Sequence, residues 1–413
     1  MQRRDFLKLM LSSSVAGSAW LLDGTGQFHE AKAALAPKTV LVLFQRGGCD
    51  GLNVVVPYAE DAYYRLRPTI AVARPGQIGG ALDLNGFFGL HPAMAALHRL
   101  YQQQQVAVFP AVHYPNASLS HFDSQHFIES GAPRKDLEGW LNRYLATAAP
   151  VGGMRGVGFG NELAQTLRGQ VAVSSLRDLA GFDLGLTDAA ETRLSSRLGQ
   201  VYAQHPEDNN PYAALLHQTG RTLLRDLDVT RSIDPTSYRP ANGAVYPANL
   251  FGSQLRQSAQ LVKSGVGLEV AMIDLGGWDT HNGQGGAEGH QASLLQALSD
   301  GIGAFCQDLG AQMQDVLILT MTEFGRTAEE NGSGGTDHGN ASAWFAVGGG
   351  VRGGVYGTWP GLGSSNLYLG RYLAHSVDYR DIFAEVLGGH LHSTALAQVL
   401  PGYTPRSLGF LGA

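Results

Sequence analysis

Short, uninterrupted apolar runs recur along the chain and predict the strands of a sheet. The clearest is Thr39–Phe44, in which four aliphatic residues follow one another. Runs of this kind are typical of strands that are buried on both faces of a parallel sheet. The other runs are Val106–Val112, Val270–Leu275, Val316–Met321 and, more weakly, Ala343–Val347.

Segments with the apolar spacing of helices lie between these runs. They are Ala93–Gln104, Pro211–Val229, Ser253–Lys263, Gln291–Gln307 and Tyr379–Leu387. Strands that alternate with helices predict an α/β domain with a central, mostly parallel sheet and helices on both faces. We expect one such domain over residues 37–413. Residues 150–245, whose best strand candidate is Gln170–Val173, are expected to form a helical and loop elaboration of it.

Residues 1–36 have the pattern of a targeting segment rather than of a folded element. The run Arg3-Arg4-Asp5-Phe6-Leu7-Lys8 precedes a moderately apolar stretch, and two small-residue sites follow within Ala31–Ala36. This segment is similar to a bacterial twin-arginine export signal, with an amphipathic helix as the alternative. We therefore expect a periplasmic or secreted protein that is exported folded. No later stretch approaches 18 apolar residues, so no transmembrane segment is predicted.

The amino-acid composition argues against a disordered chain, a nucleic-acid-binding protein and a thiolate metal site. Of the 413 residues, 44% are hydrophobic and 15% charged, which excludes an intrinsically disordered chain. Lys and Arg number 29 against 35 Asp and Glu, and no basic run occurs, so we expect no nucleic-acid partner. The two cysteines, Cys49 and Cys306, are too few for a thiolate metal site. Their spacing does not decide whether they pair.

Side chains capable of metal binding or acid–base chemistry follow four of the predicted strands. In chain order they are Asp50, Ser120, His121, Asp279, His281, Glu323 and His338. Because ligands of open parallel sheets bind beyond the carboxyl ends of the strands, we expect six of these side chains to converge on one pocket, namely Asp50, Ser120, Asp279, His281, Glu323 and His338. Asp, Glu and His are ligands for zinc, calcium, magnesium or manganese, so a divalent-metal site is predicted without the identity of its ion.

Several of these residues also have a purely structural interpretation. Asp50 fits a helix cap or a turn, and Asp279 fits an Asx turn. Glu323 fits an ion pair with Arg326, which could instead contact an anionic substrate.

Two further residues bear on the histidines of the predicted site. His290 is an alternative to His281 as a ligand. Asp337 is expected to orient the neighbouring His338 or to bind backbone rather than to bind the ion itself.

Six segments together support a family resemblance. They are Phe44–Pro57, Ser120–Gly131, Gly276–Gln284, Thr322–Arg326, Gly335–Gly339 and Asp378–Glu385. On these segments the chain resembles an uncharacterised, widely distributed family of twin-arginine-exported bacterial proteins. That family is grouped with the alkaline phosphatase and sulfatase superfamily. The resemblance implies an alkaline-phosphatase-like fold.

The resemblance also implies roles for residues of this sequence. Metal ligands would be Asp50, Asp279, His281, Glu323 and His338, and Ser120 would be the nucleophile, with His121 beside it as base or ligand. Where the superfamily has an Asp-His pair, this chain has Glu323-Phe324. The Cys/Ser-x-Pro-x-Arg motif of sulfatases is absent, since Cys49 precedes Asp50-Gly51-Leu52.

Two classes of function remain open at this point. The first is an exported metal-dependent hydrolase of phosphate or sulfate esters or a related anionic substrate, small or polymeric, with catalytic residues Ser120, His121 and Arg326. The second is a non-catalytic exported binding protein that retains the scaffold, with a protein partner that the sequence does not identify. Phe324 favours the second class, whereas the carboxylates and imidazoles favour the first.

Overall fold

The computed structural model describes residues 18–22, 28–32, 37–133, 138–150, 152–203 and 211–412. The chain divides into two units, Met1–Pro37 and Lys38–Ala413. In the first unit, β1 (Ser18–Leu22) and β2 (Phe28–Lys32) form an antiparallel hairpin. Arg3 and Arg4, on which the predicted export signal depends, lie outside the described residues.

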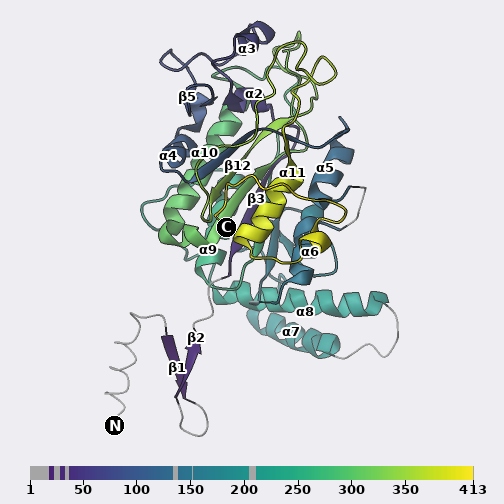
Figure 1. The fold of residues 1–413 in the computed structure, drawn as a ribbon. Coiled ribbons are helices and arrows are strands. Elements are labelled where there is room, and N and C mark those ends of the chain that lie inside the picture. Colours follow the sequence, from purple (N-terminus) through teal and green to yellow (C-terminus); the bar gives the residue numbers. More distant parts are fainter. Residues whose placement is uncertain are drawn as a thin grey trace. The chain divides into compact units, whose positions relative to one another are not determined.

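A nine-stranded sheet forms the centre of the described part of the second unit (Figure 1). The strands lie in the order β13-β7-β12-β11-β3-β10-β8-β9, and β14 also pairs with β7. Strand β12 runs antiparallel to both its neighbours, and the other pairs are parallel. The prediction of a mostly parallel sheet is therefore confirmed. The bounds are β3 Thr39–Gln45, β7 Val106–His113, β8 Gly156–Phe159, β9 Ser174–Leu176, β10 Val270–Leu275, β11 Val316–Met321, β12 Ser342–Gly348, β13 Gly354–Val355 and β14 Val377–Asp378. A small sheet consists of β4 (Val55–Val56), β6 (Gly89–Leu90) and β5 (Leu82–Asp83).

Some of the helices cover the two faces of the central sheet. The helices of the described residues are α2 Gly51–Val54, α3 Asp61–Leu66, α4 Ala95–Gln102, α5 His121–Ser130, α6 Trp140–Thr147, α7 Asp188–Ala203, α8 Pro211–Ser232, α9 Leu250–Lys263, α10 His290–Leu309, α11 Tyr379–Glu385 and α12 Leu396–Val399, with short helical turns at Pro92–Met94, Gln165–Leu167, Gly310–Asp315 and Val386–His390. Figure 1 places α4, α9 and α10 on one side of the sheet and α5, α6 and α11 on the other.

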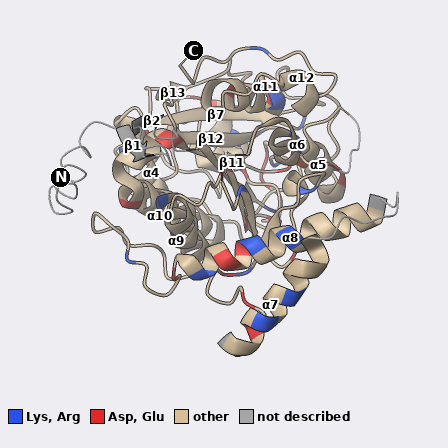
Figure 2. Ribbon diagram, turned by 90° about the horizontal axis from the view of Figure 1, so that it is seen from below, with Lys and Arg blue, Asp and Glu red and all other residues tan. Residues whose placement is uncertain are grey.

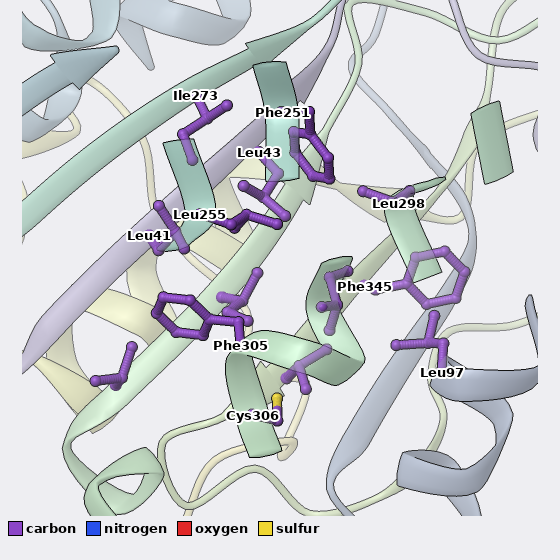
Figure 3. Packing of buried hydrophobic residues seen from close by; sticks show 14 of the residues in the cluster. Leu41, Leu43, Leu97, Phe251, Leu255, Ile273, Leu298, Phe305, Cys306 and Phe345 are labelled. Atoms are coloured by element: carbon purple, nitrogen blue, oxygen red, sulfur yellow. The ribbon is translucent and has the colours of Figure 1, made fainter. Parts of the chain in front are cut away.

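The alternation of side chains along β3 explains why both faces need covering. Leu41 and Leu43 belong to one buried cluster, whereas Val40 and Val42 belong to another. The first cluster contains side chains from α9 and α10, such as Phe251 (Figure 3). Because successive side chains of a strand point to opposite faces, an all-apolar strand requires an apolar layer on each side.

Residues 150–245 differ from the prediction in one respect. Helices α7 and α8 are present, and Figure 2 shows acidic and basic positions interspersed along both. Strands β8 and β9, however, extend the central sheet beyond β10. Strand β8 has no continuous apolar run because it includes Gly156, where a Cβ atom would lie 3.1 Å from Val173 and 3.2 Å from Val270. Close packing requires a small residue at Gly156, so the strand lacks the continuous apolar run by which the other strands were predicted.

Two further observations concern the cysteines and the membrane. Cys49 and Cys306 are both buried free cysteines. In the part of the chain that the structure describes, no helix is long and apolar enough to cross a bilayer.

Candidate metal centre

Loops from three adjacent parallel strands meet at one edge of the sheet. Strands β11, β3 and β10 are neighbours and parallel, so the segments that follow them emerge at the same, carboxyl edge. The loop after β3 packs directly on the loop after β10. At Gly47, where φ is +124°, a Cβ atom would lie 2.5 Å from the backbone nitrogen of Asp279. Only glycine combines this backbone conformation with so close an approach.

Three side chains form a group of potential metal ligands at this edge. His121, Asp279 and His338 each offer one ligand atom, and these atoms lie within 4.8 Å of one another. Nε2 of His121 is 3.7 Å from Oδ2 of Asp279, and Nε2 of His338 is 3.4 Å from Oδ1 of the same carboxylate. His281 adds a third imidazole, with Nε2 3.2 Å from Asp279 Oδ1.

Each of these imidazoles contacts an acceptor through Nδ1, the ring nitrogen that does not face Asp279. Nδ1 of His121 lies 2.8 Å from Oε1 of Glu323, and Nδ1 of His338 lies 2.8 Å from the carbonyl oxygen of Leu119. Nδ1 of His281 lies 3.1 Å from Oδ1 of Asp337. These partners only accept hydrogen bonds, so each Nδ1 donates, and in the neutral ring the lone pair is on Nε2.

The arrangement brings electron pairs together. When the three rings are neutral, their Nε2 lone pairs and the oxygens of one carboxylate face each other across the group. Such atoms repel unless a positive charge lies between them. An imidazole that donates its other nitrogen to a carboxylate or carbonyl is the usual arrangement of a metal-ligating histidine. The donor set therefore fits a divalent cation.

Glu323 supports His121 from a fully buried position. Its carboxylate accepts hydrogen bonds from His121 Nδ1, from Gln125 Nε2 at 2.9 Å and from the backbone nitrogen of Gly47 at 2.9 Å. Burial by itself would raise the pKa of Glu323, but the hydrogen bonds from His121 and Gln125 outweigh it and lower that pKa. An ionised carboxylate thus lies directly behind one imidazole.

Arg326 is buried and fixes the position of Asp279. Its guanidinium donates to Asp279 Oδ1 at 2.7 Å and to the carbonyl oxygens of Gly48 at 2.6 Å and Trp278 at 2.9 Å. Partial burial would raise the pKa of Asp279, but the hydrogen bond and charge of Arg326 outweigh it and lower that pKa. The Asp279 side chain is nevertheless 50% exposed, so its ionised carboxylate is open to solvent.

Phe324 forms an apolar side of the group. Its ring centroid lies 4.8 Å from those of His121 and His338. Burial lowers the pKa of His338, which favours the neutral, metal-binding form of this imidazole.

Two of the predicted site residues have other surroundings. The Asp50 carboxylate is buried and binds Arg67, with N–O distances of 2.5 and 2.8 Å, and Gln284, at 2.6 Å. Ser120 precedes α5, and its backbone nitrogen donates to Ser118 Oγ at 3.1 Å. No hydrogen bond joins the Ser120 hydroxyl to the imidazoles among the described residues.

The predicted histidines and their orienting residues are arranged as follows. His281 rather than His290 faces Asp279, since His290 Nε2 lies 2.9 Å from the carbonyl oxygen of Gly277. Asp337 contacts His281 rather than His338, the residue it was expected to orient. Gln125 was not predicted, although its position one helical turn after His121 is a signal that could have identified it.

Comparisons with known proteins give the following matches. A family model described as "Protein of unknown function (DUF1501)" matches residues 37–402. Among solved structures, Ps i-CgsB in complex with k-i-k-neocarrahexaose is 10% identical, with a TM-score of 0.38 and coverage of 90% of this chain and 75% of that chain. A protein in the alkaline phosphatase superfamily from Vibrio parahaemolyticus is 9% identical, with a TM-score of 0.29 and coverage of 86% and 71%. The phosphonate monoester hydrolase of Agrobacterium radiobacter is 11% identical, with a TM-score of 0.33 and coverage of 90% and 78%. No protein with a curated description matches.

Proposed function

The chain belongs to the DUF1501 family, and we propose that it is an exported metal-dependent hydrolase of phosphate or sulfate esters or a related anionic substrate. The observation that carries this proposal is the convergence of His121, His281 and His338 on the half-exposed carboxylate of Asp279. The Nδ1 atoms of the three histidines are engaged elsewhere, so in the neutral rings Nε2 and the Asp279 carboxylate face one small region. That region is open to a ligand from solvent.

The donor set favours a borderline ion such as zinc. Imidazole nitrogens suit zinc, whereas calcium, magnesium and manganese prefer sites made of oxygen atoms. His121, Asp279 and His338 would hold the ion, and His281 would complete the set. When bound, a divalent ion supplies Lewis acidity toward an ester oxygen. Glu323 would increase the basicity of His121 as a ligand.

Two features of the chain support an anionic substrate with an ester to be cleaved. Helix α5 begins at His121, so the N-terminus of this helix lies beside the proposed ligands. The start of a helix favours a bound anion. Ser120, the residue before α5, is the hydroxyl that we propose as nucleophile, with a water molecule as the alternative attacking group.

Metal content is the direct test. The exported protein, produced in its native host, is analysed for elements as wild type and as the variants Asp279→Ala and His338→Ala. We expect the wild type to contain a divalent metal and both variants to lose it while they remain folded. His98→Ala is the matched control, because His98 lies on α4 and contacts the carbonyl oxygen of Asp83. Metal-free wild type, or variants that retain metal, would contradict the proposal.

Activity separates the two classes of function. Aryl phosphate, aryl sulfate and aryl phosphonate esters are offered to the metal-loaded protein. We expect hydrolysis of at least one of them, and its loss in Asp279→Ala. Metal uptake without hydrolysis of any ester would favour the non-catalytic binding protein instead.

A further inference from the structure

The side-chain amide of Gln284 joins the two loops that carry the proposed metal ligands. Its Oε1 atom accepts hydrogen bonds from the hydroxyls of Thr280, at 2.9 Å, and Thr336, at 2.7 Å. Thr280 lies between Asp279 and His281, and Thr336 lies two residues before His338. Gln284 is fully buried, so no water replaces these contacts. One amide oxygen thus binds a threonine in the loop of Asp279 and His281 and a threonine in the loop of His338.

The other end of the amide is anchored on a buried ion pair. Nε2 of Gln284 donates to Oδ2 of Asp50, which is paired with Arg67. Arg67 also donates to the carbonyl oxygens of Thr327, at 2.9 Å, and Ala328, at 2.9 Å, in the segment after β11. A carboxylate that binds a guanidinium is ionised and only accepts hydrogen bonds. The amide nitrogen must therefore face Asp50, and the oxygen must face the threonines.

The side-chain contacts are not all that holds these loops. Backbone hydrogen bonds join Thr336 to Thr280 at 3.1 Å and Gln284 to Gly334 at 2.9 Å. These bonds remain when the amide is replaced, so we expect the loops to stay folded. Loss of the amide oxygen, however, leaves two buried hydroxyls without an acceptor, and such groups move until they find one. Movement of Thr280 or Thr336 shifts the neighbouring ligands.

We propose that Gln284 is a positioning residue, which sets the spacing between Asp279–His281 and His338 for metal binding. In this proposal Asp50 anchors Gln284 and does not bind the ion. The inference rests on the metal centre of the proposed function. It adds that the metal affinity depends on a residue whose side chain binds none of the proposed ligands and whose amide oxygen is already engaged by Thr280 and Thr336.

The test compares Co²⁺ binding by the full chain. Co²⁺ is the probe because its visible absorption reports ligand geometry as well as occupancy. Gln284→Met keeps the length of the side chain and removes both polar groups. We expect Co²⁺ affinity to fall by about 10- to 100-fold, the range seen when residues behind metal ligands are replaced, with a changed absorption spectrum.

A matched control separates positioning from general stability. Gln257 on α9 is also a buried glutamine with both ends engaged, by the backbone nitrogen of Leu179 at 2.5 Å and by Ser253 Oγ at 3.1 Å. Gln257→Met should lower stability but leave Co²⁺ affinity and spectrum as in the wild type. Thr336→Val, which removes one of the two threonine bonds, should weaken Co²⁺ binding less than Gln284→Met does. It also serves as the test variant if Gln284→Met does not fold.

A double variant provides rescue. Gln284→Glu places a second carboxylate against Asp50 and should weaken Co²⁺ binding. Combining it with Asp50→Asn returns the buried network to its original net charge and places a donor opposite the new carboxylate. Because Oδ2 of Asp50 also accepts from Arg67, the double variant leaves that guanidinium contact impaired, so binding should recover only in part. Equal Co²⁺ affinity and spectrum in wild type and in the folded test variants would overturn the positioning role alone. Failure of the wild type to bind Co²⁺ would overturn the metal centre, and the positioning role with it.

Discussion

Asp50 and Asp279 both follow a buried strand through a glycine-containing turn, yet their carboxylates have different surroundings. Asp50 is enclosed with Arg67, whose buried guanidinium requires a negative partner. Asp279 shares one oxygen with buried Arg326 and keeps half of its side chain in solvent. At the scale of single residues, therefore, the partner decides the role. A carboxylate whose oxygens are both taken by buried donors is a structural group, whereas a half-exposed one can take a ligand.

A buried histidine remote from the metal centre makes the stability of the protein depend on pH. His390 lies 3.0 Å, through Nε2, from the carbonyl oxygen of Thr39, and burial lowers the pKa of His390 to about 4. In the unfolded chain an imidazole titrates near ~6.5. Between these values the unfolded state binds a proton that the folded state does not, so stability falls as the pH falls through this window.

The variant His390→Gln keeps a donor for Thr39 and removes the titration. We expect the free energy of unfolding of the wild type to fall more steeply between pH 6.5 and 4 than that of the variant, by up to about 1.4 kcal/mol per pH unit. Urea unfolding at a series of pH values measures both slopes. Parallel curves for the two proteins would contradict the assignment.

At the scale of elements, the loops at the carboxyl edge are packed so closely that glycine is required between them. A Cβ atom at Gly335 would lie 2.4 Å from the carbonyl oxygens of Thr280 and His281. The loop that carries His338 is thus in contact with the backbone of the loop that carries His281. The distance between the ligands depends on this contact between loops that are far apart in sequence.

Gly335→Ala should push these two loops apart. We expect a loss of stability of about 1–3 kcal/mol, as for other overpacked sites, together with weaker metal binding. Gly332→Ala in the same loop is the matched control, because nothing lies within 4 Å of a Cβ atom at that position. Urea unfolding midpoints and metal titrations of the two variants make the comparison. Equal effects of both substitutions would show that the contact does not constrain the site.

At the scale of the whole molecule, the order of strands in the sheet creates the site. Strands β11, β3 and β10 are adjacent and parallel, although β3 and β10 are separated by more than 200 residues of chain. Their following loops must therefore emerge side by side. The family match begins at residue 37 and the second unit at Lys38.

Export by the twin-arginine route remains a prediction that concerns the whole chain. Replacing Arg3 and Arg4 by Lys should leave the protein unprocessed in the cytoplasm of a host that has this route, because the pair is the specific part of the signal. Cell fractionation and the intact mass of the exported form measure the result. Lys32→Gln, a charge change in the same segment, should be exported normally. Unchanged export of the Lys variant would contradict the prediction.

The sequence by itself determined the elements with a continuous apolar pattern and the chemistry that follows them. The bounds of β10 and β11 agree with the predicted runs, because strands that are mostly buried on both faces are apolar at nearly every position. Periodicity also identified α8 and α10, and the rule for strand ends identified Asp279, His281 and His338 as neighbours. His121 was a candidate base or ligand but was not part of the predicted convergent set.

Only the tertiary structure decided which of these groups have free electron pairs. The pairing of Asp50 with Arg67, the enclosure of Arg326 and the contact of Asp337 with His281 join residues from separate segments. Strand β8 was missed for the same reason, since its glycine is selected by the packing of Val173 and Val270. The pattern of apolar and polar residues within one segment indicates the burial and periodicity of that segment alone. Hydrogen bonds and charge partners between distant segments depend on three-dimensional proximity, which no local pattern contains.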